Sequence, residues 1–269
     1  MAGMRLNSSG RALLKNTLPH AQELAIVAGA YFIYMYTRAL LFDDLRATAL
    51  ANAGTIISLE KSLGFFWEPG WQAWAINSAR ALVVFFNWAY IVTFWPIILI
   101  TGTILYICNR HQYKYYRNIV LFSFVLALIG FILFPLAPPR MMAEHFVDTI
   151  KAFGPTAYAS REFANFYNPY AAMPSLHFSW TIMFGVLFLR TPNKGVKILG
   201  IIYPTTTLLA ITITANHYIM DAIAGGVLMI AAFALVELGL RRRLFLPKVR
   251  RYFQSPLDRH RVYPIQMPG

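Results

Sequence analysis

Two histidines and an aspartate in the second half of the chain have the types and spacing that phosphoryl transfer needs. His217 and Asp221 are four residues apart, so on a helix their side chains share one face. An aspartate that accepts the N–H of one imidazole nitrogen fixes the tautomer and leaves the other nitrogen free as a nucleophile. His177 follows Pro174 and Ser175 at the start of an apolar segment, where it can serve as general acid and base.

Other side chains suit the phosphate group itself. Arg140 can bind phosphate oxygens through its guanidinium fork, and the Ser175 hydroxyl, with free N–H groups at a helix start, can hold others. Arg38 and Lys61 lie near the same predicted membrane face and are additional candidate phosphate ligands. The sequence offers neither paired carboxylates nor a Cys/His ligand set for a metal, so we expect a metal-independent reaction without a cofactor.

The composition indicates an integral membrane protein. The chain of 269 residues is 58% hydrophobic and 13% charged, whereas a soluble domain carries about 25% charged residues; the mean hydropathy is +0.50. Basic residues at cytoplasmic ends explain the net charge of +13, and no nucleic-acid-binding motif is present. Cys108 is the only cysteine, which excludes an intrachain disulfide.

Gaps without charged residues predict six membrane-spanning helices, because about 20 apolar residues cross a bilayer. The spans are expected at about 24–42, 80–110, 117–140, 174–190, 197–221 and 217–240. Between the first two, residues 45–63 predict an amphipathic helix in the outer interface. The expected fold class is an all-α integral membrane bundle, with a basic N-terminus at 1–23, a catalytic domain at 24–240 and a basic tail at 241–269.

The lysines and arginines set the orientation of this bundle. Most of them lie on one side if the N-terminus is cytoplasmic, so we expect a multi-pass plasma or inner membrane protein with both termini in the cytoplasm. A reporter fused after Gly269 tests this orientation. On this topology Arg140, His177, His217 and Asp221 all reach the outer face, although three separate parts of the chain deliver them.

Structural roles compete with the catalytic interpretation. His177 could be a buried histidine bonded to a backbone carbonyl, Asp221 a helix cap, and Arg140 a marker of topology. Arg140 lies on the wrong side for such a marker, and capping by Asp221 is compatible with catalysis. Because ionisable groups within membranes are functional by default, their convergence favours an active site.

Three blocks resemble the signatures of the type 2 phosphatidic acid phosphatase superfamily: Pro138-Pro139-Arg140, Pro174-Ser175-Leu176-His177 and Asn216-His217-Tyr218-Ile219-Met220-Asp221. Their form, together with the stretch 51–68, is similar to the inositol phosphorylceramide synthase-like branch. The resemblance covers about residues 45–235 and implies a six-helix membrane fold. It also implies roles in the site: His217 as nucleophile, Asp221 as its orienting partner, His177 as acid and base, and Arg140 as phosphate ligand.

Some positions depart from the superfamily pattern. Leu133 stands where a lysine is expected, and Ala210-Ile211 replaces a serine–arginine pair. A site with fewer cations than the superfamily pattern neutralises less negative charge, which favours a substrate of lower charge, such as a phosphodiester. We therefore predict a lipid phosphotransferase that moves a phosphoryl or phospho-head-group from a membrane lipid to a lipid or alcohol acceptor through a phosphohistidine.

Two alternatives to the transferase stay open at this point. One is a hydrolase that uses water as the acceptor, acting on a lipid phosphate or a polyprenyl diphosphate. The other is a non-enzymatic lipid transporter or scaffold. Transporters tend to have internal repeats and charges near the middle of the membrane, whereas no repeat is evident here and the polar residues collect at one face.

Overall fold

The computed structural model describes residues 8–41, 45–154 and 169–241, without the side chains of residues 8–16, 34, 37–41 and 240–241. The chain divides into two units, Met1–Phe42 and Asp43–Gly269. The first unit holds helix α1 (Ser8–Leu41), which contains most of the predicted first span. The predicted cytoplasmic segments at 1–7 and 242–269 lie outside the described residues.

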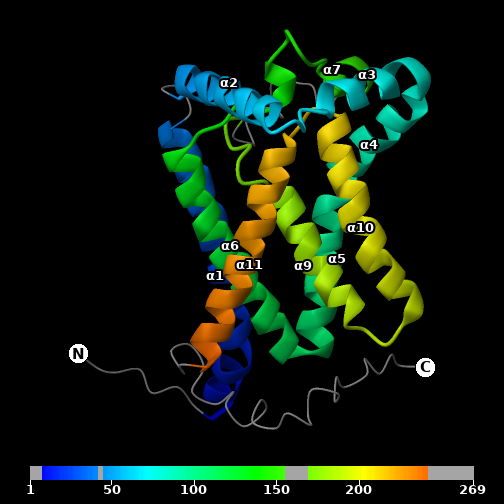
Figure 1. The fold of residues 1–269 in the computed structure, drawn as a ribbon. Helices are drawn as coiled ribbons and strands as arrows, with labels where there is room; N and C mark the ends of the chain where they lie inside the picture. The colour runs from blue at the N-terminus through cyan, green and yellow to red at the C-terminus, as the bar shows by residue number, and fades with distance from the viewer. Residues whose placement is uncertain (1–7, 42–44, 155–168, 242–269) are drawn as a thin grey trace. The chain divides into compact units, whose positions relative to one another are not determined.

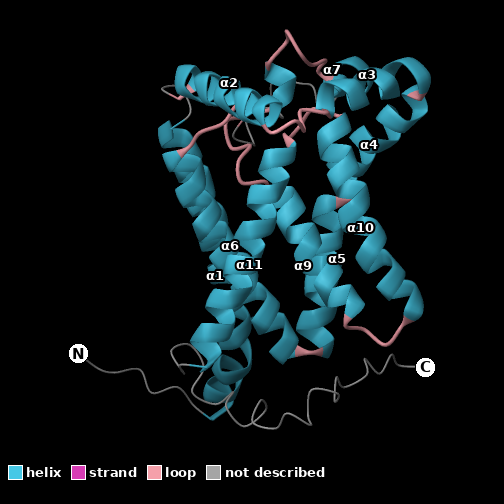
Figure 2. Ribbon diagram, in the orientation of Figure 1, coloured by secondary structure: helices cyan, strands magenta, loops and turns pink. Residues whose placement is uncertain are grey.

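The second unit is built from helices, with its longer loops gathered at one end (Figure 2). In chain order (Figure 1) its elements are α2 (Arg46–Ser62), α3 (Glu68–Ser78), α4 (Arg80–Val92), α5 (Phe94–Cys108), α6 (Arg110–Leu133), the 3-10 turn η1 (Pro139–Met141), α7 (Thr149–Phe153), α9 (Leu176–Leu189), α10 (Lys194–Ile213) and α11 (Ile219–Arg241). The all-α fold class is therefore confirmed for the described residues.

The number of spans is only partly settled. Helix α6, helix α10 and the part of α11 at Ile219–Gly239 are long and apolar enough to cross a membrane. Helices α3 and α4, bent by 118° against each other, make a fourth candidate if the pair crosses together, and α5 and α9 are apolar but shorter. The described residues thus indicate a multi-pass membrane protein with three or four candidate spans, and the predicted six are not confirmed.

The predicted second span is not one helix. It is divided at Thr93 into α4 and α5. Pro96 explains the break, because proline has no N–H for the carbonyl of Val92 and its ring clashes with that carbonyl in a continuous helix. The Thr93 hydroxyl donates to Ala89 O at 2.6 Å and so satisfies one carbonyl next to the break. A gap without charges measures the length of apolar chain, but it does not show where a helix is interrupted.

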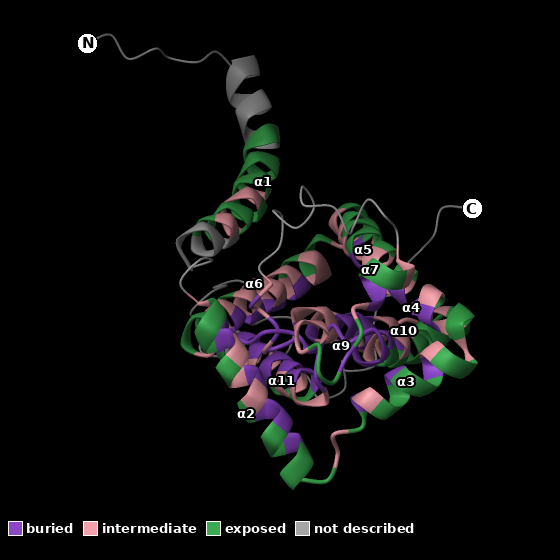
Figure 3. Cartoon of the chain, turned by 90° about the horizontal axis from the view of Figure 1, so that it is seen from above, coloured by how far each residue is buried: buried purple, intermediate pink, exposed green. Residues whose placement is uncertain are grey.

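Helix α2 forms where an amphipathic helix was predicted. Its buried residues recur at helical spacing: Ala49, Ala53, Ile56, Ile57 and Glu60. In Figure 1 this helix lies across the end of the unit at which α11 begins, and Figure 3 shows its buried positions on the side toward α11. The Asn52 amide also donates to Pro135 O at 2.8 Å, which fixes α2 to the chain that follows α6.

Glycines bring α9 close to both α10 and α11. A Cβ on Gly185 would lie 2.8 Å from Gly200 O, and one on Gly200 would lie 2.9 Å from Gly185 O, so α9 and α10 meet backbone to backbone. A Cβ on Gly225 in α11 would lie 2.6 Å from Ser175 O. The Ser179 hydroxyl also contacts Gly225 O at 2.7 Å. Gly225 therefore lets α11 approach the start of α9 closely.

We expect Gly225→Ala to destabilise the protein by about 1–3 kcal/mol, because the added Cβ meets a backbone oxygen that cannot move aside. Thermal unfolding in detergent measures the change. Gly226→Ala is the matched control, since its Cβ would have only Ile182 Cδ1 nearby, at 3.8 Å. Equal unfolding temperatures for the two variants would show that the helices do not need this close contact.

Candidate active site

The loop between α10 and α11 carries Asn216 and His217. Helix α10 ends in a Schellman turn, in which Asn216 N donates to Ile211 O at 2.9 Å and Ala215 N donates to Thr212 O at 3.0 Å. Ala215 has a positive φ of 55° at the position that glycine usually occupies, which costs about 1 kcal/mol. This turn reverses the chain and places His217 two residues before α11 rather than inside it.

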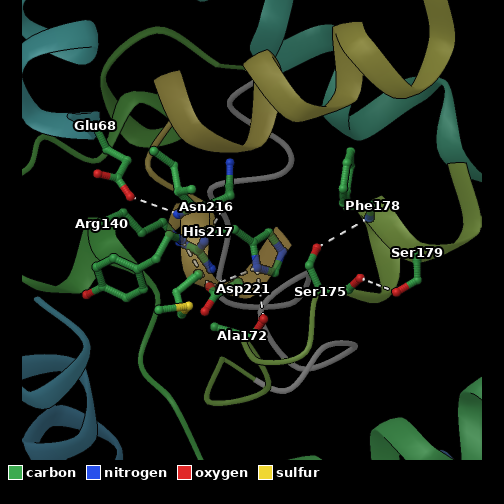
Figure 4. Close-up of polar contacts among 12 residues, drawn as sticks. Glu68, Arg140, Ala172, Ser175, Phe178, Ser179, Asn216, His217 and Asp221 are labelled. Carbon is green, nitrogen blue, oxygen red and sulfur yellow. Dashed lines mark hydrogen bonds and ion pairs between the residues drawn. The ribbon is translucent and has the colours of Figure 1, made fainter. Parts of the chain in front are cut away.

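His217 and Asp221 are in contact, as Figure 4 shows. The His217 Nδ1 lies 2.9 Å from Ala172 O and 3.3 Å from Asp221 Oδ2. Both neighbours are acceptors, so Nδ1 carries the proton and Nε2 has a free lone pair. Tyr218 N donates to the same aspartate oxygen at 3.0 Å. Asp221 is fully buried and His217 is 6% exposed, which holds the imidazole in one orientation.

Asp221→Asn is expected to lower turnover by about 10²-fold, less than the roughly 10⁴-fold loss that the equivalent change causes in a Ser-His-Asp triad. The reason is that Ala172 O still accepts the Nδ1 proton and keeps the tautomer, while the negative charge that supports a positive imidazole is lost. Steady-state kinetics on a lipid phosphate measure the change. Asp148→Asn is the control, because the Asp148 carboxylate caps the short helix α7 instead of contacting His217. A loss of 10⁴-fold or more would mean that the Ala172 carbonyl does not hold the tautomer.

Arg140 lies beside the loop that carries His217. Its backbone N–H donates to Ala215 O at 2.8 Å, and its guanidinium donates to Asn216 Oδ1 at 2.5 Å. The Asn216 amide in turn donates to Thr214 Oγ1 at 2.6 Å. Arg140 is partly exposed, so the guanidinium retains donors that can meet an anion next to His217.

Ser175 connects α9 to the His217 loop. Its backbone N–H donates to Asp221 O at 3.1 Å, and its hydroxyl caps α9 by accepting from Phe178 N at 3.3 Å. Pro174 therefore precedes the cap, and the helix of the span expected at about 174–190 begins at Leu176. Ser175 is fully buried and its hydroxyl oxygen already accepts the bond from Phe178 N; its role as a phosphate ligand stays a prediction.

His177 lies in the first turn of α9 and stacks on aromatic rings. Its ring centroid is 3.9 Å from that of Phe94 and 4.4 Å from that of Tyr90. The imidazole also lines an apolar cavity of about 580 Å³ between α4, α5, α9 and α10. Among the described residues, no hydrogen bond joins His177 to His217.

Of the two additional candidate cations, the structure describes the side chain of Lys61 alone, and this side chain is not brought into the group. Lys61 is exposed, and its Nζ lies 5.2 Å from the centroid of the Phe66 ring. Arg38 lies outside the residues whose side chains the structure describes. Within the described ranges, no three His, Cys, Asp or Glu side chains are grouped as metal ligands; the metal-independent reaction stays a prediction.

Sequence reasoning overlooked Glu60 and Glu68, which are fully buried and accept hydrogen bonds from the start of α11. It included both in the stretch 51–68 that carries the family resemblance, but gave neither a role. One signal was available for Glu60, because it continues the series Ala49, Ala53, Ile56 on the buried face of α2. A carboxylate at such a position needs a partner in the interior.

The fold and the site together define an all-α membrane protein with a His–Asp pair and an arginine around one loop. Residues 54–235 match the PAP2 superfamily, and the chain belongs to this superfamily. No match was found to a protein of described function or to a solved structure. Membership indicates a lipid phosphate phosphatase-like enzyme with a lipid phosphate substrate in the membrane.

Proposed function

We propose that the protein transfers a phosphoryl or phospho-head-group from a membrane lipid to an alcohol acceptor through a phosphohistidine on His217. The observation that carries the proposal is the arrangement of the His217 ring. Its Nδ1 is held by Ala172 O and Asp221 Oδ2, at 2.9 and 3.3 Å, so that Nε2 is the nucleophilic atom. Buried Asp221 stabilises the positive imidazole that forms as Nε2 attacks.

The reaction then has two displacements at phosphorus. In the first, the bond between Nε2 of His217 and phosphorus forms while the bond to the leaving oxygen breaks, and that oxygen takes a proton from His177. In the second, the acceptor hydroxyl attacks phosphorus, the P–N bond breaks, and the hydroxyl proton returns to His177. Arg140 binds the phosphate oxygens during both steps, which depend mainly on position and charge neutralisation.

The scarcity of cations favours a phosphodiester substrate. Ala210 and Ile211 are 1% and 0% exposed and pack inside the unit, while Leu133 is 77% exposed. These three positions thus supply no charge to a phosphate, and a monoanionic phosphodiester needs less neutralisation than a dianionic monoester. This supports head-group transfer of the kind carried out by the inositol phosphorylceramide synthase-like branch. We further propose that the site lies on the extracytoplasmic face and that both termini lie in the cytoplasm.

Product analysis tests this proposal. Purified protein in detergent micelles is incubated separately with labelled phosphatidylinositol, phosphatidic acid or polyprenyl diphosphate, each with and without ceramide as the acceptor alcohol. A new phospholipid formed only with the acceptor supports the transferase. Release of inorganic phosphate or inositol phosphate at the same rate with and without ceramide would overturn the transferase proposal and indicate a hydrolase. Parallel incubations with EDTA test the metal-independent reaction, which a loss of activity would overturn.

A further inference from the structure

Two buried carboxyl groups hold the start of the helix that carries Asp221. Glu60 Oε1 accepts from Met220 N at 2.8 Å, and Glu68 Oε1 accepts from Ile219 N at 2.8 Å. The first N–H groups of a helix have no partner within the helix and carry its positive partial charge. Both glutamates are fully buried, so these contacts are shielded from water.

The turn after α2 brings the two glutamates together. Gly64 has a φ of 77°, the left-handed conformation that glycine adopts readily. Phe65 N donates to Glu60 O at 3.0 Å and Gly64 N donates to Lys61 O at 3.2 Å, which closes a Schellman turn. The chain then leads directly into α3, whose first residue is Glu68. Glu60 and Glu68 thus approach the same helix start from two helices.

The second oxygens of the two carboxyl groups are also buried. Within the described residues, no hydrogen-bond donor reaches Glu60 Oε2 or Glu68 Oε2. Two ionised carboxylates in such a setting repel each other, and one proton held between them removes the repulsion. A protonated carboxyl still has an oxygen that accepts a backbone N–H, so both contacts to α11 are compatible with a shared proton.

We propose that Glu60 and Glu68 are positioning residues that share one proton and fix the first turn of α11, and through it His217 and Asp221. The inference rests on the proposed role of His217. Met220 and Ile219 directly follow the His217-Tyr218 loop segment, so a shift of their N–H groups moves the imidazole and its aspartate partner. Neither glutamate touches the reacting atoms. Their loss is therefore expected to lower kcat by displacing His217 and Asp221.

The titration of Glu60 gives the shared proton a pH signature. Burial, above all, raises the pKa of Glu60 from about 4.5 to about 8; the hydrogen bond from Met220 opposes this, while Glu68 and Asp221 add to it. The groups that face it are Glu68 from α3, Asp221 from α11 and the buried Tyr218 side chain. Because the folded state holds this proton more tightly than the unfolded chain, stability falls as pH rises from about 4.5 to about 8.

Glu60→Gln and Glu68→Gln test the shared proton. In either variant the amide oxygen still accepts from α11, and the amide N–H replaces the shared proton as a donor to the remaining carboxylate. We expect both variants to keep near wild-type activity. Glu60→Gln should lose the fall in unfolding temperature that we expect of the wild type between about pH 4.5 and about pH 8, and Glu68→Gln should reduce it, because Glu60 stays buried there. An unchanged fall in both variants would overturn the shared proton.

Alanine variants test the positioning role. Glu60→Ala and Glu68→Ala remove the acceptor, and we expect kcat to fall by about 10²-fold with little change in KM. Glu144→Ala, an exposed glutamate in an outer loop, is the matched control. If an alanine variant does not fold, aspartate replaces alanine, since its carboxylate is one methylene too short to reach the helix. Folded variants with wild-type kcat would overturn the positioning role.

The experiments separate this inference from the proposed function. If His217→Ala retained activity, the phosphohistidine proposal would fail. The pH dependence of unfolding in the glutamine variants would still decide whether Glu60 and Glu68 share a proton, because that measurement requires no substrate.

Discussion

His217→Ala is expected to lower phosphate transfer by at least about 10⁴-fold, because the variant has no atom that can form the phosphorus–nitrogen bond. Incubation with a lipid labelled at phosphorus should leave no acid-labile label on the variant protein, whereas wild-type protein should carry such a label. Both steps of the proposed reaction use Nε2 of this ring. No other described change in the site is expected to have a larger effect.

Two variants show whether this loss is chemical or structural. His217→Asn places an amide N–H where Nδ1 donates to Ala172 O and Asp221 Oδ2, so it keeps the hydrogen bonds but supplies no nucleophile. We expect it to be as inactive as the alanine variant and more stable to heat. His145→Ala, which changes an exposed histidine between η1 and α7, should behave as wild type. Substantial transfer by His217→Asn would contradict the phosphohistidine mechanism.

His177→Ala is expected to slow turnover by about 10²- to 10⁴-fold, the usual contribution of a general acid and base. The effect should differ between the two steps. With a p-nitrophenyl phosphodiester, whose leaving group needs no proton, the phosphohistidine should form and then persist, because the acceptor hydroxyl is not activated. Acid-labile label should accumulate to nearly one equivalent, and a burst of p-nitrophenol should precede slow turnover.

His177→Phe separates proton transfer from packing. The His177 ring stacks on Phe94 and Tyr90 at centroid distances of 3.9 and 4.4 Å, and a phenyl ring preserves that stacking without an ionisable nitrogen. We expect the phenylalanine variant to fold as wild type and to be as slow as the alanine variant. Wild-type turnover in His177→Phe would mean that His177 serves only to pack α9 against α4 and α5.

The surroundings of His177 and His217 bear on the kind of substrate that fits the site. His177 lines the apolar cavity of about 580 Å³, so a substrate in contact with His177 can place apolar atoms in that cavity. Arg140 and Asn216 supply polar groups at the His217 loop, and Phe94 and Tyr90 supply aromatic rings at His177. This asymmetry matches a substrate with a charged head group and an apolar chain.

The sequence by itself determined the features that depend on local spacing and composition. The apolar composition and the charge-free gaps predicted an all-α membrane protein, and the three blocks around Arg140, His177 and His217 predicted the PAP2 superfamily. The i to i+4 spacing of His217 and Asp221 placed their side chains together, and the pattern of 45–63 predicted a helix. These properties are readable because each depends on residues that are close in the sequence.

Only the tertiary structure decided which distant groups meet. Ala172 O shares the Nδ1 proton of His217 from 45 residues away, and Glu60 reaches Met220 across 160 residues. The Ala172 pairing leaves no pattern, because a backbone carbonyl has no sequence identity. The periodicity of α2 marks Glu60 as an interior position, but it does not name Met220 as the partner. The stacking of His177 on Phe94 and Tyr90 has the same origin, because it follows from how α9 packs against α4 and α5. The break at Thr93 follows from Pro96, a local feature that hydropathy along the chain does not register.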